Sequence, residues 1–171
     1  MKSWRLIIAD CPCLNVSCLR AGTVRLALAL ILALLVVPGY VVAPSLFAHL
    51  DSAAQAGALA GDIFHIANRA LFLLIFAVAL FWRGHEAGRW RWSLLGALLL
   101  LCLLSAFVLA PHMAALKEAM GPIDALPADD PARARFGLWH GVSALLHLAA
   151  SLLAVGLVAL GWQAKGTACK G

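Results

Sequence analysis

The chain has 171 residues, of which 64% are hydrophobic and only 12% are Asp, Glu, Lys or Arg. Soluble domains carry about 25% charged residues, and a soluble chain of this length cannot bury so much apolar surface in one core. Disordered chains are poor in apolar residues, which excludes that class as well. The composition therefore predicts a protein whose main solvent is lipid.

Four apolar stretches are long enough to cross a bilayer, which takes about 20 helical residues. The second contains Arg69, whose insertion costs about 2.5–3.5 kcal/mol, a cost that the surrounding Leu, Ile and Phe residues offset. Unbroken runs such as residues 98–104 exclude the alternation of outer-membrane strands. The predicted fold class is all-α, a four-helix transmembrane bundle. Its spans are expected at about residues 24–48, 62–82, 92–111 and 137–162.

Basic residues gather on one side of this predicted bundle. Nine Lys and Arg residues flank the side shared by both termini, against three on the other side. Positive loops stay in the cytoplasm, so we expect an N-in/C-in protein of the bacterial inner membrane. The basic residues are split over three segments, which favours a lipid bilayer partner and argues against nucleic acid. A homo-oligomer or a membrane partner is left open. Interfacial anchors are expected at Trp82, Trp90, Trp92 and Trp162.

The two ends of the chain are expected to be cytoplasmic tails, a flexible one over residues 1–21 and a shorter one over 163–171. Cys11, Cys13 and Cys18 lie in the first tail. Disulfides are not expected there because cytoplasmic thiols stay reduced, and a metal site would need a fourth ligand. We interpret these cysteines as structural bystanders.

Polar residues recur on one face of the second and fourth spans. On each span three of them stand at positions i, i+3 and i+7, a spacing that keeps them on one helix face. Facing lipid, each stripe would cost several kcal/mol, so both are expected to face the bundle interior and to form a polar pocket open to the periplasm. The pocket residues are Asp62, His65, Asn68 and Arg69 on the second span and His140, Ser143 and His147 on the fourth.

Three hypotheses fit these stripes. The first is helix–helix adhesion, worth about 0.6–2 kcal/mol per polar contact, in a non-catalytic structural or accessory protein. The second is a small-ligand or ion pocket. The third is a haem or copper centre, which would need His65 together with His140 or His147, because the last two are two turns apart. His112 and Met113 are further candidate ligands for copper. No nucleophile–base pair is present inside the membrane, so no reaction class is indicated.

Proline and glycine mark the expected breaks. Pro38-Gly39 predicts a kink in the first span, and the small residues of 53–61 predict a compact, helical outer connection. Residues 112–121 are expected to extend the third span as a short helix ended by Gly121. Residues 123–134 are expected to be an exposed loop.

Four short motifs stand in order at matching depths. They are Pro44-Ser45-Leu46-Phe47, Ala56-Gly57-x-x-Ala60-Gly61-x-Ile63-Phe64, Pro111-x-Met113-x-x-Leu116 and Phe136-x-x-Trp139-His140-x-x-Ser143-x-x-Leu146-His147. Over about residues 22–162 the chain resembles the domain of unknown function 4149 family, four-span proteins similar to transmembrane protein 205.

This resemblance implies a fold and a membrane location rather than a reaction, because the family has no settled biochemical activity. A more distant similarity to CopD-type copper-resistance proteins and to a haem-binding protoporphyrinogen oxidase implies haem or copper as cofactor. The chain departs from the family pattern at two positions. Trp139 stands where Leu is usual, and His147 stands where Asn is usual, which weakens a metal role for His147.

Overall fold

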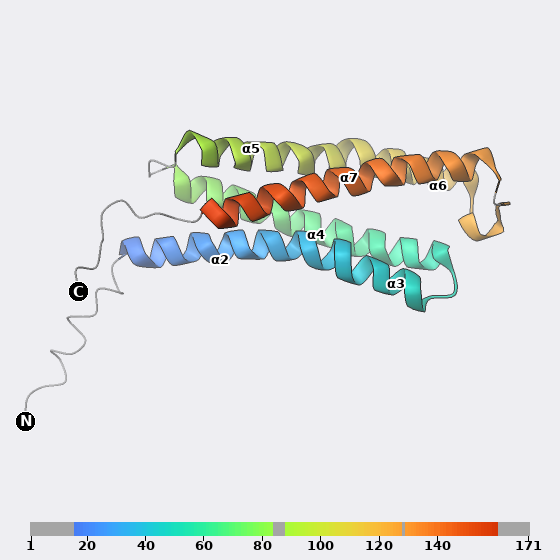
Figure 1. Ribbon diagram of the computed structural model, residues 1–171, viewed down its shortest axis with the longest axis horizontal. Helices are drawn as coiled ribbons and strands as arrows, with labels where there is room; N and C mark the ends of the chain where they lie inside the picture. Colours follow the sequence, from blue (N-terminus) through green and yellow to red (C-terminus); the bar gives the residue numbers. More distant parts are fainter. Residues whose placement is uncertain (1–15, 84–87, 128, 161–171) are drawn as a thin grey trace, which may run out of the picture.

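The structure is a computed structural model that describes residues 16–83, 88–127 and 129–160. The described chain is helical, with no strand, so the predicted all-α class is confirmed (Figure 1). The elements are α2 (Val16–Val36), η2 (Val37–Val42), α3 (Ala43–His49), α4 (Ala53–Trp82), α5 (Arg89–Leu104), η3 (Ser105–Leu109), α6 (Ala110–Met120), η4 (Ile123–Ala125) and α7 (Pro131–Leu160).

These elements join into four helical rods of membrane length. They run over Arg20–His49, Ala53–Trp82, Arg89–Met120 and Pro131–Leu160, and each has 30 or 32 residues. At 1.5 Å per residue such a rod is about 45 Å long, which matches a bilayer with its headgroups. The rods alternate in direction, so that α2 begins and α7 ends at the same end of the bundle (Figure 1).

The helices extend further than the expected spans. Residues 53–61 are helical, as predicted, but they form the first turns of α4 rather than a separate connection. The loop expected over 123–134 is shorter, because α7 begins at Pro131 and Asp130 caps it by accepting from the backbone N–H of Ala132 at 2.7 Å. Pro fits the first turn of a helix, where its missing N–H costs nothing.

The tails differ from expectation where they are described. Residues 16–21, expected in a flexible tail, belong to α2. The remaining part of that tail, with Cys11 and Cys13, lies outside the described residues, as do Trp162 and the tail over 163–171.

Two rods contain a π-helical segment. The kink predicted at Pro38-Gly39 is confirmed: η2 interrupts the first rod there, and α3 turns away from the axis of α2 (Figure 1). In the third rod η3 joins α5 to α6, which continues outward to Met120. This extension and its end at Gly121, which has φ of 71°, confirm the prediction for residues 112–121.

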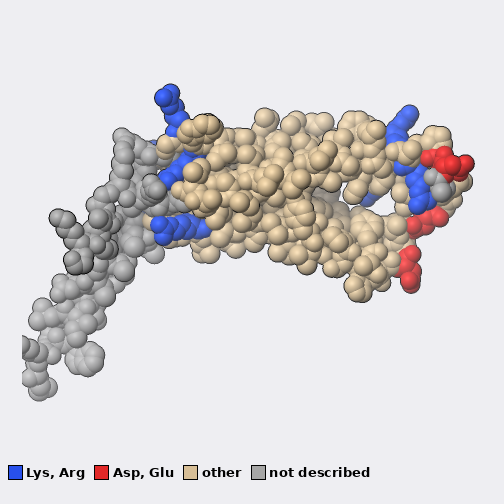
Figure 2. All heavy atoms as spheres, viewed as in Figure 1, with Lys and Arg blue, Asp and Glu red and all other residues tan. Residues whose placement is uncertain are grey.

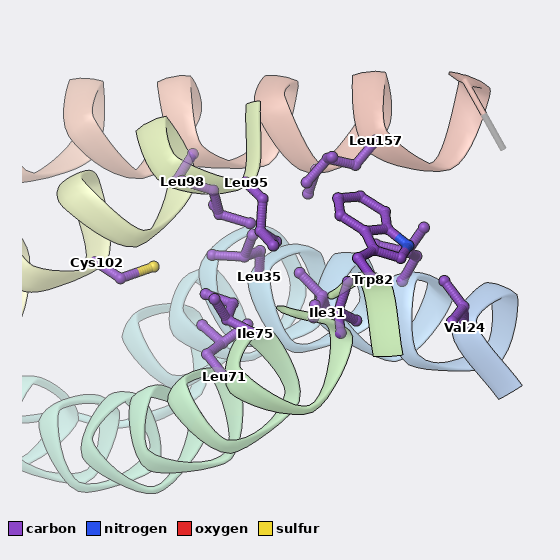
Figure 3. Close-up of a cluster of buried hydrophobic side chains, with 14 of the residues drawn as sticks. Val24, Ile31, Leu35, Leu71, Ile75, Trp82, Leu95, Leu98, Cys102 and Leu157 are labelled. Carbon is purple, nitrogen blue, oxygen red and sulfur yellow. The ribbon is translucent and has the colours of Figure 1, made fainter. Parts of the chain in front are cut away.

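The tightly packed core lies in the half of the bundle near the chain ends, where α2, α4, α5 and α7 all meet. Ile31 and Leu98 are fully buried there, and Trp82 is only 2% exposed (Figure 3). The expectation that Trp82 anchors the interface is therefore wrong, since its ring packs inside the bundle edge-on to Trp92 at 5.8 Å. Trp90, at 78% exposed, is free to take that role.

Arginines close the helix ends beside this core. Arg20 Nη2 donates to the Phe81 carbonyl at 2.7 Å, and Arg91 Nη2 donates to the Leu160 carbonyl at 3.3 Å. Both carbonyls belong to the last turns of helices, which carry partial negative charge and lack helical partners. Acidic side chains of the described residues instead appear at the opposite end of the molecule (Figure 2).

At that opposite end an acidic clasp holds the start of α4. Ser52 caps the helix by accepting from the Gln55 N–H at 3.2 Å. Asp124 Oδ2, from η4, accepts from Ser52 Oγ at 2.7 Å and from the Ala54 N–H at 3.1 Å. These hydrogen bonds, that from Ser52 first, hold the pKa of Asp124 below its ordinary value.

The clasp predicts a pH-dependent stability. Because the folded-state pKa of Asp124 is lowered, its contribution is present above the ordinary carboxyl pKa and is lost as the pH falls through the lowered value. Asp124→Asn should therefore lower the melting temperature slightly at pH 7, and this difference should disappear in acid. Thermal unfolding in detergent measures both values. Asp129→Asn, an exposed acid of the same loop, serves as the control, and a deficit that persists unchanged in acid would contradict the clasp.

Candidate functional site

The half of the bundle away from the chain ends, called the outer half below, is split into two pairs of helices. There α3 packs on α4, and α6 packs on α7. Figure 2 shows a hollow between the two pairs, on the side of the molecule that carries the acidic residues. The divergence of α3 after η2 opens this space, because α3 no longer follows α2 along α7 (Figure 1).

A histidine of α7 contacts the first rod where α3 begins to diverge. His147 Nε2 lies 2.9 Å from the Leu35 carbonyl oxygen, directly before the π-helical segment. A carbonyl only accepts, so Nε2 carries the proton in this hydrogen bond. The ring lies over Gly39, where a Cβ would overlap with Nε2. Only glycine therefore leaves room for this close approach.

Aromatic and hydroxyl groups surround His147. The Phe64 ring of α4 packs edge-on to the imidazole at 5.3 Å, and the Tyr40 ring of η2 lies 5.6 Å away. Tyr40 Oη donates to Ser151 Oγ at 3.4 Å, and Ser151 Oγ donates to the His147 carbonyl at 2.9 Å. A small polar network thus joins the first and fourth rods, and an aromatic ring of the second rod packs against it.

A cation joins the two helix pairs near their outer ends. Lys117 Nζ, from α6, lies 3.4 Å from the Gly57 carbonyl of α4 and 6.0 Å from the centre of the Phe136 ring of α7. The Phe136 ring in turn stacks with that of His140 at 6.1 Å. A Cβ on Gly57 would lie between Lys117 Nζ and the Phe47 ring, at 3.7 and 3.8 Å. Lys117 therefore reaches across from one helix pair to the other.

The polar stripe of α7 lies on the face that this helix turns toward the bundle. Ser143 lies seven residues before the buried Ala150, two full turns, and so shares its face. His147 is half-buried in the network described above, and His140 is exposed beside Phe136. The face that carries this stripe is the one that α7 turns toward the rest of the bundle.

The polar stripe of α4 faces outward, so the expectation that both stripes meet is wrong. Asp62, His65 and Arg69 are exposed. Arg69 stands two residues after the buried Ala67, so its side chain lies about 200° around the helix axis from that of Ala67. Within the described ranges no hydrogen bond or ion pair joins these three residues to α7. Asn68 is half-buried at the edge of the packed face.

The candidate metal ligands are not gathered. No group of three or more His, Cys, Asp or Glu side chains suited to a metal occurs among the described residues. His65 lies on the outward face of α4, away from the network of His147. His112 instead packs against Trp139 at 4.4 Å, and Met113 beside it is half-buried. The arrangement does not support a haem or copper centre held by these residues.

Sequence reasoning missed three residues that build the hollow: Gly39, Tyr40 and Lys117. The Pro38-Gly39 pair was a usable signal, because a glycine beside a proline kink admits a close neighbour. Lys117 gave no such signal, since a lysine at the outer end of a span is ordinary.

The four membrane-length helices and their lipid-facing apolar surfaces define a multi-pass membrane protein. The chain belongs to the family called Domain of unknown function (DUF4149), whose model matches residues 26–122, more than half of its length. The match confirms the resemblance to that family, while the likenesses to transmembrane protein 205 and to CopD-type proteins remain predictions. The motif over 136–147 lies beyond the matched residues. Comparisons with curated proteins and with solved structures find no match.

The contact between Gly39 and His147 predicts that alanine is tolerated very differently at two glycines. Gly39→Ala should push the imidazole off the Leu35 carbonyl and lower the free energy of unfolding by about 1–3 kcal/mol. Gly141→Ala, where a Cβ meets nothing within 4 Å, should be neutral or stabilising. Unfolding in bicelles measures both.

A double-mutant cycle makes this prediction specific. In a His147→Ala background Gly39→Ala should cost much less, because the clashing ring is gone. Equal tolerance of Gly39→Ala and Gly141→Ala in the natural background would contradict the proposed contact.

Proposed function

We propose that this chain is a multi-pass protein of the bacterial cytoplasmic membrane, with both termini in the cytoplasm, that binds a small ligand or ion in the hollow at its periplasmic side. The observation that carries the proposal is the hollow between the two helix pairs (Figure 2), with the His147 network and Lys117 on the helices that border it.

The charge distribution supports the orientation. Among the described residues, Arg20, Arg83 and Arg91 lie at the end where α2 begins and α7 ends. Asp51, Asp124 and the other described acids lie toward the opposite end. Positively charged loops are retained in the cytoplasm, which supports a cytoplasmic location for this end of the bundle and a periplasmic location for the hollow.

The chemistry of the hollow supports binding. His140, Ser143 and His147 present imidazole and hydroxyl groups along one wall, and these groups donate and accept hydrogen bonds and carry protons. Their polarity is costly inside a membrane unless it faces protein or a ligand. Asp62, His65 and Arg69 lie outside this site.

A cysteine-labelling experiment tests the hollow. In a full-length chain whose five native cysteines are replaced by alanine, Ser143→Cys is compared with Leu145→Cys in phosphatidylcholine nanodiscs. Leu145 is nearly level with Ser143 but is 68% exposed on the other side of α7. Ser143→Cys should react about tenfold faster with a charged maleimide, because lipid excludes the reagent from the Leu145 side. Equal rates would refute an accessible hollow.

A second labelling experiment tests the orientation. Glu118→Cys, on the exposed outer turn of α6, should react with an impermeant maleimide added to intact spheroplasts. A cysteine introduced at Arg89, which is exposed at the opposite end, should react only after the membrane is opened. The reverse pattern would invert the proposed topology.

A further inference from the structure

We infer that the hollow binds an anionic phospholipid of the outer leaflet, with the lipid phosphate at Lys117 and an acyl chain between the two helix pairs. The inference rests on the proposed function and names the class of ligand.

The mouth of the hollow carries the positive charge of Lys117. Lys117 Nζ contacts a neutral carbonyl and the face of an aromatic ring. Within the described part of the chain no Asp or Glu forms an ion pair with it, although Glu118 is the next residue and Asp124 follows in η4. An ammonium group held by such weak partners keeps its capacity to bind an anion.

Aromatic rings lie near Lys117 and His147. The rings of Phe47 and Phe136 lie beside Lys117, and that of Phe64 lies deeper, against His147. These rings offer apolar surface below a cationic mouth. A free inorganic anion would gain nothing from them, whereas an acyl chain would.

The position of the hollow gives a lipid a route of entry. The hollow lies between the helix pairs (Figure 2), at the depth of the outer leaflet, and the contact from Lys117 Nζ to the Gly57 carbonyl links α6 to α4 near the outer surface. Below that link a lipid can enter sideways from the bilayer. The headgroup then stays at the level of its neighbours, so binding needs no extraction of the lipid from the membrane.

The test uses protection of the Ser143→Cys label in nanodiscs. Replacing a minor fraction of the phosphatidylcholine by phosphatidylglycerol of the same acyl chains should slow labelling severalfold. Each rate is divided by that of Glu118→Cys in the same discs, which corrects for repulsion of the reagent by an anionic surface. Lys117→Gln should abolish the protection, and Lys117→Arg should retain it. Arg135→Gln, which removes an exposed cation at the same end, should also retain it.

The outcomes separate the two proposals. Absence of protection by phosphatidylglycerol, or protection that survives Lys117→Gln, would overturn the lipid assignment. Equal protection by inorganic phosphate in phosphatidylcholine discs would overturn it too, because the site would then bind free anions. In each of these cases a faster reaction at Ser143→Cys than at Leu145→Cys would still support the hollow itself. Because each variant is compared with itself in two lipids, a general loss of stability does not imitate the effect.

Discussion

The structure depends on how one broken membrane helix is held against its neighbour. In hydrocarbon every N–H and C=O must find a partner within the protein. Pro38 has no N–H to donate, and the first rod passes through a π-helical segment at this point. His147 donates from α7 to the Leu35 carbonyl just before the segment, and Gly39 provides the space for the ring. This hydrogen bond holds the kinked part of the first rod against α7.

The same break creates the candidate site. Below it, α2 packs with α4, α5 and α7 around a dense apolar core (Figure 3). Beyond it, α3 follows α4, and the hollow opens between this pair and α6 with α7. The polar network of Tyr40, His147 and Ser151 marks the boundary between the two halves. The inner half is tightly packed and the outer half is divided, as a site reached from one side requires.

The helix ends combine two electrostatic effects. Because α4 and α7 run in the same direction, their C-terminal carbonyls meet Arg20 and Arg91 at one end, while Asp124 and Asp130 cap their N-termini at the other. Each charge has the sign that the helix dipole favours. The residues that favour one topology therefore also stabilise the helices individually.

The amino-acid sequence alone was enough to predict the four helices, the kink at Pro38-Gly39 and the end of the third rod at Gly121, because span length, proline and glycine act locally. It could not decide which face of a helix packs. In a soluble protein the apolar face is the buried one, but in a membrane both lipid and the protein interior are apolar. Because polar side chains are costly in lipid, the stripe with Arg69 was expected to face the bundle interior, but it faces outward. The stripe with His147 faces the interior. Only the tertiary structure brought Gly39, Tyr40 and Lys117 to the hollow, because their partners come from helices distant in the chain.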